Sequence, residues 1–314
     1  MPQCPGMVHE PEKAQPGLKP EFPRKIHQRV IDSCEDVPEM KPALEIPLNQ
    51  AGITSKTVWI DIPQGRLPFE AEVLVSLPGE FRGIHMSRME RAISGLFSRK
   101  FRDIRDYSLE LCRGVLSCQR GETAIVTLKG AIPQLTLTSV SHELSVEGLE
   151  ISARTEGKRG QGRMETTSFL GISLTHMTAC PCTQVYNRGL FPNSDRTLMP
   201  THSQRCMTTL EVEDKEAALS FEDIYFCLAS CLHVSQDLLK RPDEAELVLK
   251  CHRQPQFAED VVRTVAASTA RRLKKLLPGD SRVRVESVSY ESIHRHNVKC
   301  VLECHVEQIT APGI

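Results

Sequence analysis

The sequence has no excess of charge of either sign. Its 39 lysine and arginine residues are balanced by 40 aspartate and glutamate residues over 314 positions, for a net charge of −1. Such a balance gives no overall positive field to hold a nucleic acid, although local basic patches remain possible. No run approaches the roughly 18 consecutive apolar residues of a membrane-spanning helix, and residues 1–22 lack the apolar core of a signal peptide. We therefore expect a cytoplasmic protein with no nucleic-acid or membrane partner.

Cysteine, by contrast, is plentiful, with 12 residues in a chain too long to be a small disulfide scaffold. In a reducing cytoplasm these thiols serve packing, metal binding or catalysis. Three pairs have spacings that suit a buried helix or strand face, where a free cysteine behaves as a small apolar residue. These pairs are Cys112 and Cys118, Cys227 and Cys231, and Cys300 and Cys304.

The order of local patterns indicates a duplicated architecture. Residues 1–44 hold eight of the 20 prolines and show no sustained period, which predicts an irregular N-terminal arm. Two strand patterns, two helix patterns and two strand patterns follow, and the same order then repeats. This repeat predicts an α+β fold of two tandem ββααββ units, with antiparallel sheets and helices on one face. The halves cover 45–157 and 158–314, and the second carries most of the candidate site.

Four stretches of the second half offer metal-ligating side chains. They are Cys180-Pro181-Cys182, His202, Glu244 just after a long helix predicted over 220–241, and Glu291 with His294 and His296. Their separations match no zinc-finger spacing, so a ligand, a nucleophile and a packed turn all remain open for the two thiols. Residues 183–201 show no clear period, which is typical of a functional or mobile loop.

The spacing of residues in the last of these stretches predicts its local structure. Period-two alternation over residues 294–304 predicts a strand in which His294 and His296 point to the same face as the apolar residues. A change of parity just upstream predicts a β-bulge near Glu286, a feature often found beside active sites. The alternative interpretation of the two histidines is a hydrogen-bonded pair in the core.

Taken together, these residues resemble the type IB GTP cyclohydrolases of the tunnelling fold, including the archaeal enzymes that begin methanopterin synthesis. The resemblance covers roughly 260 residues, and the proline-rich first 44 residues and the long segment 183–201 depart from it. The motifs that carry it are IPLNQAGI (46–53), GIHMSR (83–88), CPCTQ (180–184), HSQR (202–205), LLKRPDE (238–244), QPQFAEDVVR (254–263) and ESIHRH (291–296).

The resemblance implies roles for individual residues. It implies Cys180, His202 and Glu244 as metal ligands, so that Cys182 would be structural. It places Glu291 and His294 beside Cys180 at the reaction centre, with His294 moving protons and Glu291 orienting it. For substrate binding it implies Glu259 as the anchor of the guanine ring, and Arg88 and Arg205 as candidates for the triphosphate because they lie inside the motifs.

The implied reaction opens the imidazole ring of GTP at C8 with a metal-activated water and releases formate. The expected product is a 7,8-dihydroneopterin phosphate, with the 2′,3′-cyclic phosphate favoured, as the first step of tetrahydromethanopterin or folate-type pterin synthesis. The resemblance favours Fe²⁺, with Zn²⁺ or Mn²⁺ as alternatives, and a homodimer or homotetramer with sites at subunit contacts. Two other readings remain: a nitrile reductase of the same fold with a nucleophilic cysteine, and a non-catalytic interaction module stapled by a metal.

Overall fold

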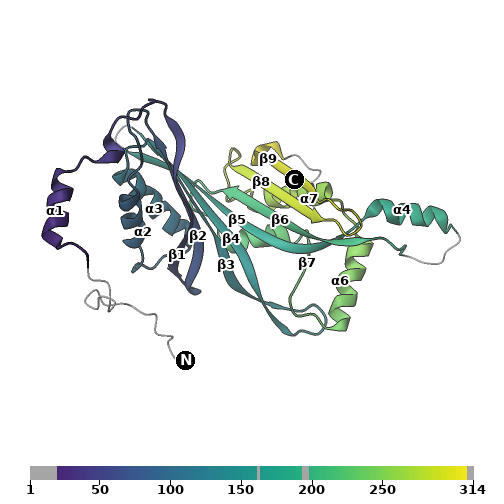
Figure 1. The fold of residues 1–314 in the computed structure, drawn as a ribbon. Helices are drawn as coiled ribbons and strands as arrows, with labels where there is room; N and C mark the ends of the chain where they lie inside the picture. Colours follow the sequence, from purple (N-terminus) through teal and green to yellow (C-terminus); the bar gives the residue numbers. More distant parts are fainter. Residues whose placement is uncertain (1–19, 161–162, 193–197, 310–314) are drawn as a thin grey trace.

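The computed structural model describes residues 20–160, 163–192 and 198–309 (Figure 1). Its strands form one antiparallel sheet in the order β1-β2-β3-β4-β5-β6-β8-β9, and the short β7 pairs with β5. The strands are β1 (Leu48–Ile62), β2 (Gly65–Leu77), β3 (Thr123–Leu137), β4 (Leu144–Arg159), β5 (Met164–Ala179), β6 (Ser203–Glu213), β7 (His233–Val234), β8 (Arg282–Tyr290) and β9 (Val298–His305).

The described helices are α1 (Arg24–Ser33), α2 (Met86–Ser94), α3 (Ile104–Cys118), α4 (Pro181–Leu190), α5 (Phe221–Ala229), α6 (Arg241–Arg253) and α7 (Ala258–Leu273), with short 3₁₀ helices η1 (Val37–Glu39) and η2 (Val306–Gln308). The predicted repeat is present as β1-β2-α2-α3-β3-β4 followed by β5-β6-α5-α7-β8-β9. Helices α1, α4 and α6 and the short strand β7 are additions to it. The predicted α+β fold of tandem ββααββ units, a tunnelling-fold architecture, is confirmed. Within the described ranges, no helix is long and apolar enough to cross a membrane.

The two halves share one sheet. Strands β4 and β5 pair over ten residue pairs, from Glu150 opposite Ser173 to Arg159 opposite Met164. Only glycine fits at position 157 of this ladder, because a Cβ added there would lie 2.7 Å from the sulfur of Cys112 in α3. The prediction of separate halves at 45–157 and 158–314 therefore describes a structural repeat within one continuous sheet.

The helices of both halves cover the same face of the sheet. Buried strand residues such as Val126, Ile172 and Val285 form one apolar cluster with Leu111 of α3 and Val265 of α7. Their neighbours along each strand point to the opposite face, because side chains alternate in a strand. The predicted placement of helices on one face is confirmed.

A buried ion pair joins the halves beside this core. Arg105 of α3 pairs with Asp214, which follows β6, and their side chains are only 4% and 1% exposed. Arg105 also donates to the carbonyl oxygen of Leu219 at 3.0 Å and to Asp103 at 3.2 Å. Asp214 in turn accepts from the backbone N–H of Ala218 at 2.9 Å. Both charges are therefore compensated where water does not reach them.

A second buried polar group lies between β5, β6 and β8. Nε2 of His176 is 2.8 Å from the hydroxyl of Thr208, which donates to Ser287 at 2.9 Å. Nδ1 of His176 is buried and has no hydrogen-bond partner among the described residues. Burial lowers the pKa of His176 to about 4, so the ring is neutral at physiological pH.

Two predicted stretches differ in the structure. The N-terminal arm contains α1 and η1 within residues 20–44, while residues 1–19 lie outside the described residues. The helix predicted over 220–241 ends at Ala229, because the chain next forms β7 against β5, with Val234 opposite His176. A separate helix, α6, then starts at Arg241 with proline in its first turn, and it carries Glu244.

The segment with the two histidines also differs. Strand β9 begins at Val298, so His294 and His296 lie in the connection between β8 and β9 rather than on a strand. The bulge predicted near Glu286 is absent, since the pairing of β8 with both neighbours runs through that residue without a shift. The apparent change of parity arises because serines continue the buried face, as Ser287 does through its hydrogen bond to Thr208.

Candidate active site

A cavity of about 300 Å³ lies where β5 and β8 end and β6 and β9 begin. Six of the residues singled out in the sequence line it: Cys180, His202, Glu259, Glu291, His294 and His296. Gln204, Phe257, Ala258, Ser289 and Val298 complete the lining. Residues up to 118 positions apart in the chain, Cys180 and Val298, are thus brought together.

The end of β5 positions Cys180. Its backbone N–H donates to the carbonyl oxygen of His202 at 3.0 Å, and its own carbonyl oxygen accepts from the hydroxyl of Thr201 at 2.7 Å. Pro181 then begins α4, because proline suits the first helical position. The Cys-Pro-Cys stretch is therefore not extended: Cys180 lines the cavity, whereas Cys182 is exposed and does not line it.

Two residues that line this cavity each have a buried polar atom without a partner. Nδ1 of His202 and Oε1 of Gln204 have no hydrogen-bond partner among the described residues. The other amide atom of Gln204, Nε2, donates to the hydroxyl of Thr178 at 3.2 Å. Leaving a buried polar atom unpaired costs about 1–3 kcal/mol, so such atoms in a cavity indicate a ligand.

The remaining residues face these atoms from β8, its loop and α7. The hydroxyl of Ser289 donates to Oε1 of Glu291 at 2.7 Å and so orients that carboxylate. The ring of His294 lies 6.5 Å from that of His202, edge to face, and stacks on His296 at 5.3 Å. Glu259 lies in the first turn of α7, where the helix dipole favours negative charge.

Sequence reasoning missed Gln204 and Ser289 as part of this site. Gln204 stands inside the HSQR motif, and that motif was the one signal available for it. Ser289 would follow from continuing the alternation of Val283 and Val285 through β8 without a bulge.

Glu244 is not brought to the cavity within one chain. It lies in the first turn of α6, next to Asp243, whose carboxylate accepts from the backbone N–H groups of Val140 and Ser141 at 2.8 and 3.0 Å. The opposite end of α6 contacts α4, since the carbonyl oxygen of His252 accepts from Gln184 at 2.8 Å. Eight residues of helix separate the two ends by about 12 Å.

The two predicted arginines also lie elsewhere. Arg205 follows Gln204 on β6 and therefore points to the other face of the sheet, where it lines a cavity of about 700 Å³ with residues of β3 and β4. Arg88 lies on α2 in the first half, with its guanidinium 3.7 Å from Asp36 and 3.8 Å from Glu39. Neither arginine lines the cavity that contains Cys180.

Among the residues that the structure describes, only Asp36, Glu39 and His85 bring three potential ligand atoms within 4.8 Å of one another. Arg120 donates to Glu39 at 3.1 Å, and Arg88 lies beside both carboxylates. Hydrogen bonds from Arg120 and His85 hold the pKa of Glu39 below its usual range. Two guanidinium groups already compensate the two carboxylates, so this group is an ion-pair network that fixes η1 against α2.

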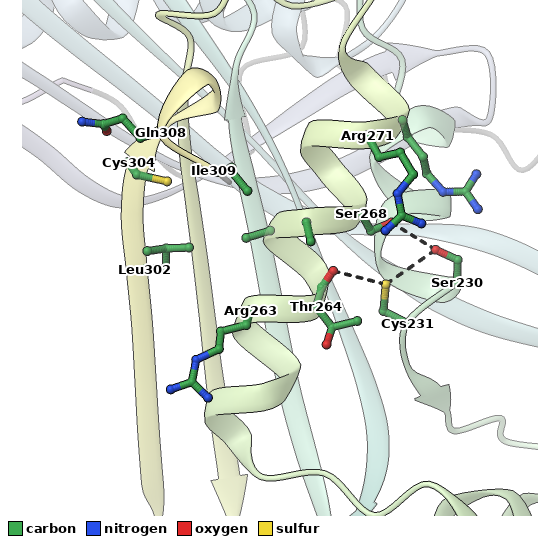
Figure 2. Close-up of a pocket in the computed structure, with 13 residues that line it drawn as sticks. Ser230, Cys231, Arg263, Thr264, Ser268, Arg271, Leu302, Cys304, Gln308 and Ile309 are labelled. Carbon is green, nitrogen blue, oxygen red and sulfur yellow. Dashed lines mark hydrogen bonds between the residues drawn. The ribbon is translucent and has the colours of Figure 1, made fainter. Parts of the chain in front are cut away.

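A further cavity, of about 720 Å³, lies between α7 and β9 (Figure 2). Arg263 and Arg271 extend along it, and Cys231 forms its wall through a hydrogen bond to the carbonyl oxygen of Thr264. Cys231 and Cys304, two of the thiols predicted to serve packing, line this cavity, and none of the predicted catalytic, substrate-binding or metal-ligand residues does.

The side chains of the smaller cavity fit a divalent metal in donor type. A thiol, an imidazole with an unpartnered buried nitrogen and a carboxylate are ligands that iron and zinc accept. A cavity with three such donors and room for a small molecule is typical of a catalytic centre rather than a structural one.

Two ββααββ units in one antiparallel sheet, with this donor set at its end, define a tunnelling-fold protein with a candidate metal centre. The comparison with known families then gives the group: the family model for type I GTP cyclohydrolase folE2 matches residues 34–300. The chain belongs to this family.

Individual relatives are similar over most of their length. The chain is 32% identical over 273 residues to the GTP cyclohydrolase MptA of Thermoplasma volcanium, covering 83% of this chain and 92% of that protein. It is 27% identical over 280 residues to the MptA of Aeropyrum pernix, covering 87% and 97%. Among solved structures, a uricase from Arthrobacter globiformis matches with a TM-score of 0.48 and 12% identity, covering 84% of this chain and 95% of that one.

Proposed function

We propose that this protein is a GTP cyclohydrolase of pterin biosynthesis, of the kind that the archaeal MptA relatives represent. The observation that carries the proposal is that residues from four separate motifs of the sequence line one cavity in a chain that belongs to the folE2 family. These residues are Cys180, His202, Glu259, Glu291 and His294.

Cys180 and His202 hold the metal in this proposal, with a carboxylate as third ligand. The unpartnered Nδ1 of His202 supports this role, because a metal would give that buried nitrogen the partner it lacks. A divalent ion bound here would supply a hydroxide nucleophile at neutral pH. We favour Fe²⁺ over Zn²⁺ or Mn²⁺ on the resemblance to the archaeal branch.

Glu259 selects the base. A carboxylate accepts from both N1–H and the 2-amino group of guanine, a donor pair that adenine does not have. The position of Glu259 in the lining of the cavity, on the first turn of α7, supports this role. The neighbouring Phe257 provides an apolar surface beside it.

His294 moves protons to and from the purine nitrogens as the ring opens, a role for which imidazole is suited near neutral pH. Glu291 orients it, and Ser289 fixes Glu291 through the 2.7 Å hydrogen bond. The stacked ring of His296 restricts His294 on its other side. Formate leaves from C8, and the product is a dihydroneopterin phosphate, with the 2′,3′-cyclic phosphate favoured.

The test is incubation of anaerobically purified protein with GTP and Fe²⁺, followed by mass identification of formate and the pterin product. ATP serves as the matched control, and it should give neither. The mass also separates a triphosphate product from a cyclic phosphate. Absence of formate with Fe²⁺, Zn²⁺ and Mn²⁺ alike would contradict the proposal.

The reductase alternative needs a reactive cysteine. The candidates are Cys180, which lines the cavity, and Cys182, which is exposed and does not line it. Cys251 is a poor candidate, because it is fully buried and burial raises its pKa to about 12. A chelator should abolish turnover under the proposed function, while a thiol alkylator at low dose should abolish it under the alternative.

A further inference from the structure

Gln204 is a residue of the cavity lining that the proposed function leaves without a role. Its Oε1 is buried and has no hydrogen-bond partner among the described residues. Its other amide atom, Nε2, donates to the hydroxyl of Thr178 at 3.2 Å, and the two residues lie directly opposite each other in the pairing of β5 with β6. The role of Gln204 depends on which of its two amide atoms is free for a ligand, and the residues behind Thr178 determine this.

A chain of hydrogen bonds continues from Thr178 to Glu291. The hydroxyl of Thr178 lies 3.2 Å from the sulfur of Cys206. Cys206 lies opposite Ser289 in the pairing of β6 with β8, and a hydrogen bond joins their side chains. Ser289 donates to Glu291 at 2.7 Å. Thr178, Cys206 and Ser289 are only 2%, 1% and 3% exposed, so water does not offer these three side chains other partners.

The carboxylate at the end of this chain sets its direction. An ionised carboxylate only accepts hydrogen bonds, so Ser289 uses its single proton on Glu291. The oxygen of Ser289 then accepts from the thiol of Cys206, and the sulfur of Cys206 accepts from the hydroxyl of Thr178. That hydroxyl has no second proton, so it accepts from Nε2 of Gln204, as the structure shows. The free end of the chain is therefore the carbonyl oxygen of Gln204, an acceptor that needs an N–H or O–H donor.

The chemistry of GTP leaves few donors for this oxygen, and the assignment that follows rests on the proposed function. In that function Glu259 accepts from N1–H and the 2-amino group of guanine. The ring atoms N3, N7 and O6 are acceptors, and the ionised phosphate oxygens are acceptors as well. The donors that remain are the second amino hydrogen and the hydroxyls of the ribose.

The position of Gln204 selects the ribose. His202 and Gln204 are two residues apart, so their side chains lie on the same face of the sheet and about 7 Å apart along the strand. His202, a metal ligand in the proposed function, marks the C8 end of the purine. The ribose is attached at N9, which is bonded to C8, whereas the amino group lies at the opposite end with Glu259. The hydroxyl nearest to C8 is the 2′-hydroxyl, since its carbon is next to the one bonded to N9.

We propose that Gln204 accepts a hydrogen bond from the 2′-hydroxyl of the ribose, and that Thr178, Cys206 and Ser289 are positioning residues that hold its carbonyl oxygen in place. The protein then distinguishes a ribonucleotide from a 2′-deoxyribonucleotide. A ligand without the hydroxyl leaves the buried oxygen of Gln204 unpaired, and a site built to hydrogen-bond a hydroxyl rejects analogues that lack it.

The test is isothermal titration calorimetry of the Fe²⁺-loaded protein with 7-deaza-GTP and 7-deaza-2′-deoxy-GTP. Both have carbon in place of N7, so C8 is not part of an amidine and the ring is not opened during the measurement. Wild type should bind the ribose form about tenfold more tightly than the deoxyribose form. Gln204→Leu should reduce this ratio to about one. Gln204→Glu should keep the ratio, because a carboxylate still accepts, although its charge weakens the binding of both analogues.

The positioning residues are tested by the same ratio. Thr178→Val removes the hydroxyl at nearly constant volume and frees the amide to rotate, so the ratio should fall below about threefold. Thr178→Ser keeps the hydroxyl and should keep the ratio. Thr209→Val is the matched control: it removes the 2.7 Å hydrogen bond to Ser173 between the same two strands, on the opposite face of the sheet, and should leave the ratio unchanged. Far-UV circular dichroism on each variant confirms that the fold is retained.

Equal binding of the two analogues by wild type would overturn the assignment, as would a preserved ratio in Gln204→Leu. Loss of the ratio in Thr209→Val as well as in Thr178→Val would overturn the positioning role. If neither analogue binds, the KM values for formate release from GTP and 2′-deoxy-GTP give the same comparison. Absence of formate from GTP would count against the proposed function, whereas formate release with equal KM values for the two nucleotides would overturn this inference alone.

Discussion

The buried histidine of β5 gives the protein a pH-dependent stability that can be calculated from the structure. His176 has no exposed surface, its Nε2 is 2.8 Å from the hydroxyl of Thr208, and its Nδ1 lacks a partner among the described residues. Burial is the main cause that lowers its pKa from 6.5 to about 4, and the nearby His233 acts in the same direction. Protonating this ring in the folded state would place a charge where no acceptor compensates it.

Between these two pKa values the unfolded chain binds a proton that the folded chain does not, so the free energy of unfolding rises with pH in this window. The stabilisation is complete above about pH 6.5 and is lost progressively as the pH falls to about 4. The interval between the two values, at about 1.36 kcal/mol per pH unit, corresponds to about 3 kcal/mol.

Urea unfolding of wild type and His176→Gln, measured from about pH 4 to about pH 7, isolates this effect because other titrating groups cancel in the difference. The stability difference between the two proteins should shrink by about 3 kcal/mol toward low pH. His27→Gln on the exposed helix α1 is the control and should leave the pH dependence unchanged. If the free energies of unfolding of wild type and His176→Gln change with pH in the same way, the reasoning is refuted.

Three further predictions concern the cavity and the link between the halves. Cys180→Ala should remove the bound metal and the activity while leaving the fold intact, whereas Cys182→Ala, at an exposed position, should keep both metal and activity. If metal analysis shows that the two variants lose bound metal equally, the roles of the two thiols are misassigned. Glu259→Gln should lower kcat/KM for GTP roughly 30- to 1000-fold, or about 2–4 kcal/mol, without changing metal content; normal steady-state kinetics would leave Glu259 as a helix-start acid only. Asp214→Ala should destabilise the fold by about 3–5 kcal/mol, because it leaves the guanidinium of Arg105 buried without its main counter-charge; a loss below about 1 kcal/mol in urea unfolding would contradict the structural role given to this pair.

The regular parts of the fold could be predicted from local pattern. Helix α3 carries the local signals of a helix, with Asp103 as the N-cap that accepts from the backbone N–H of Asp106. The long helix over 220–241 was wrong because its apolar spacing continues past Ala229, while the pairing of β7 with β5 depends on residues about 57 positions earlier. Non-local strand pairing of this kind leaves no mark in a local window.

The site could be predicted only in part, for a similar reason. Motif resemblance selected Cys180, His202 and Glu259, which the fold brings to one cavity. It also selected Arg205, which strand alternation turns to the other face of the sheet, and Glu244, which lies on α6 and does not line the cavity. The face to which the side chain of Arg205 points follows from the position of Gln204 in the cavity lining, because neighbours in a strand point to opposite faces.

The continuous ladder between β4 and β5 has a consequence for how the molecule unfolds. Ten residue pairs and one apolar cluster cross the line between the two repeats, so neither repeat has a separate core to retain when the other opens. A duplicated sequence would otherwise permit two independent folding units. Here calorimetry should give a single cooperative transition, with equal van't Hoff and calorimetric enthalpies. Damage to the first repeat would then reduce the population of chains with an intact candidate site around Cys180 in the second.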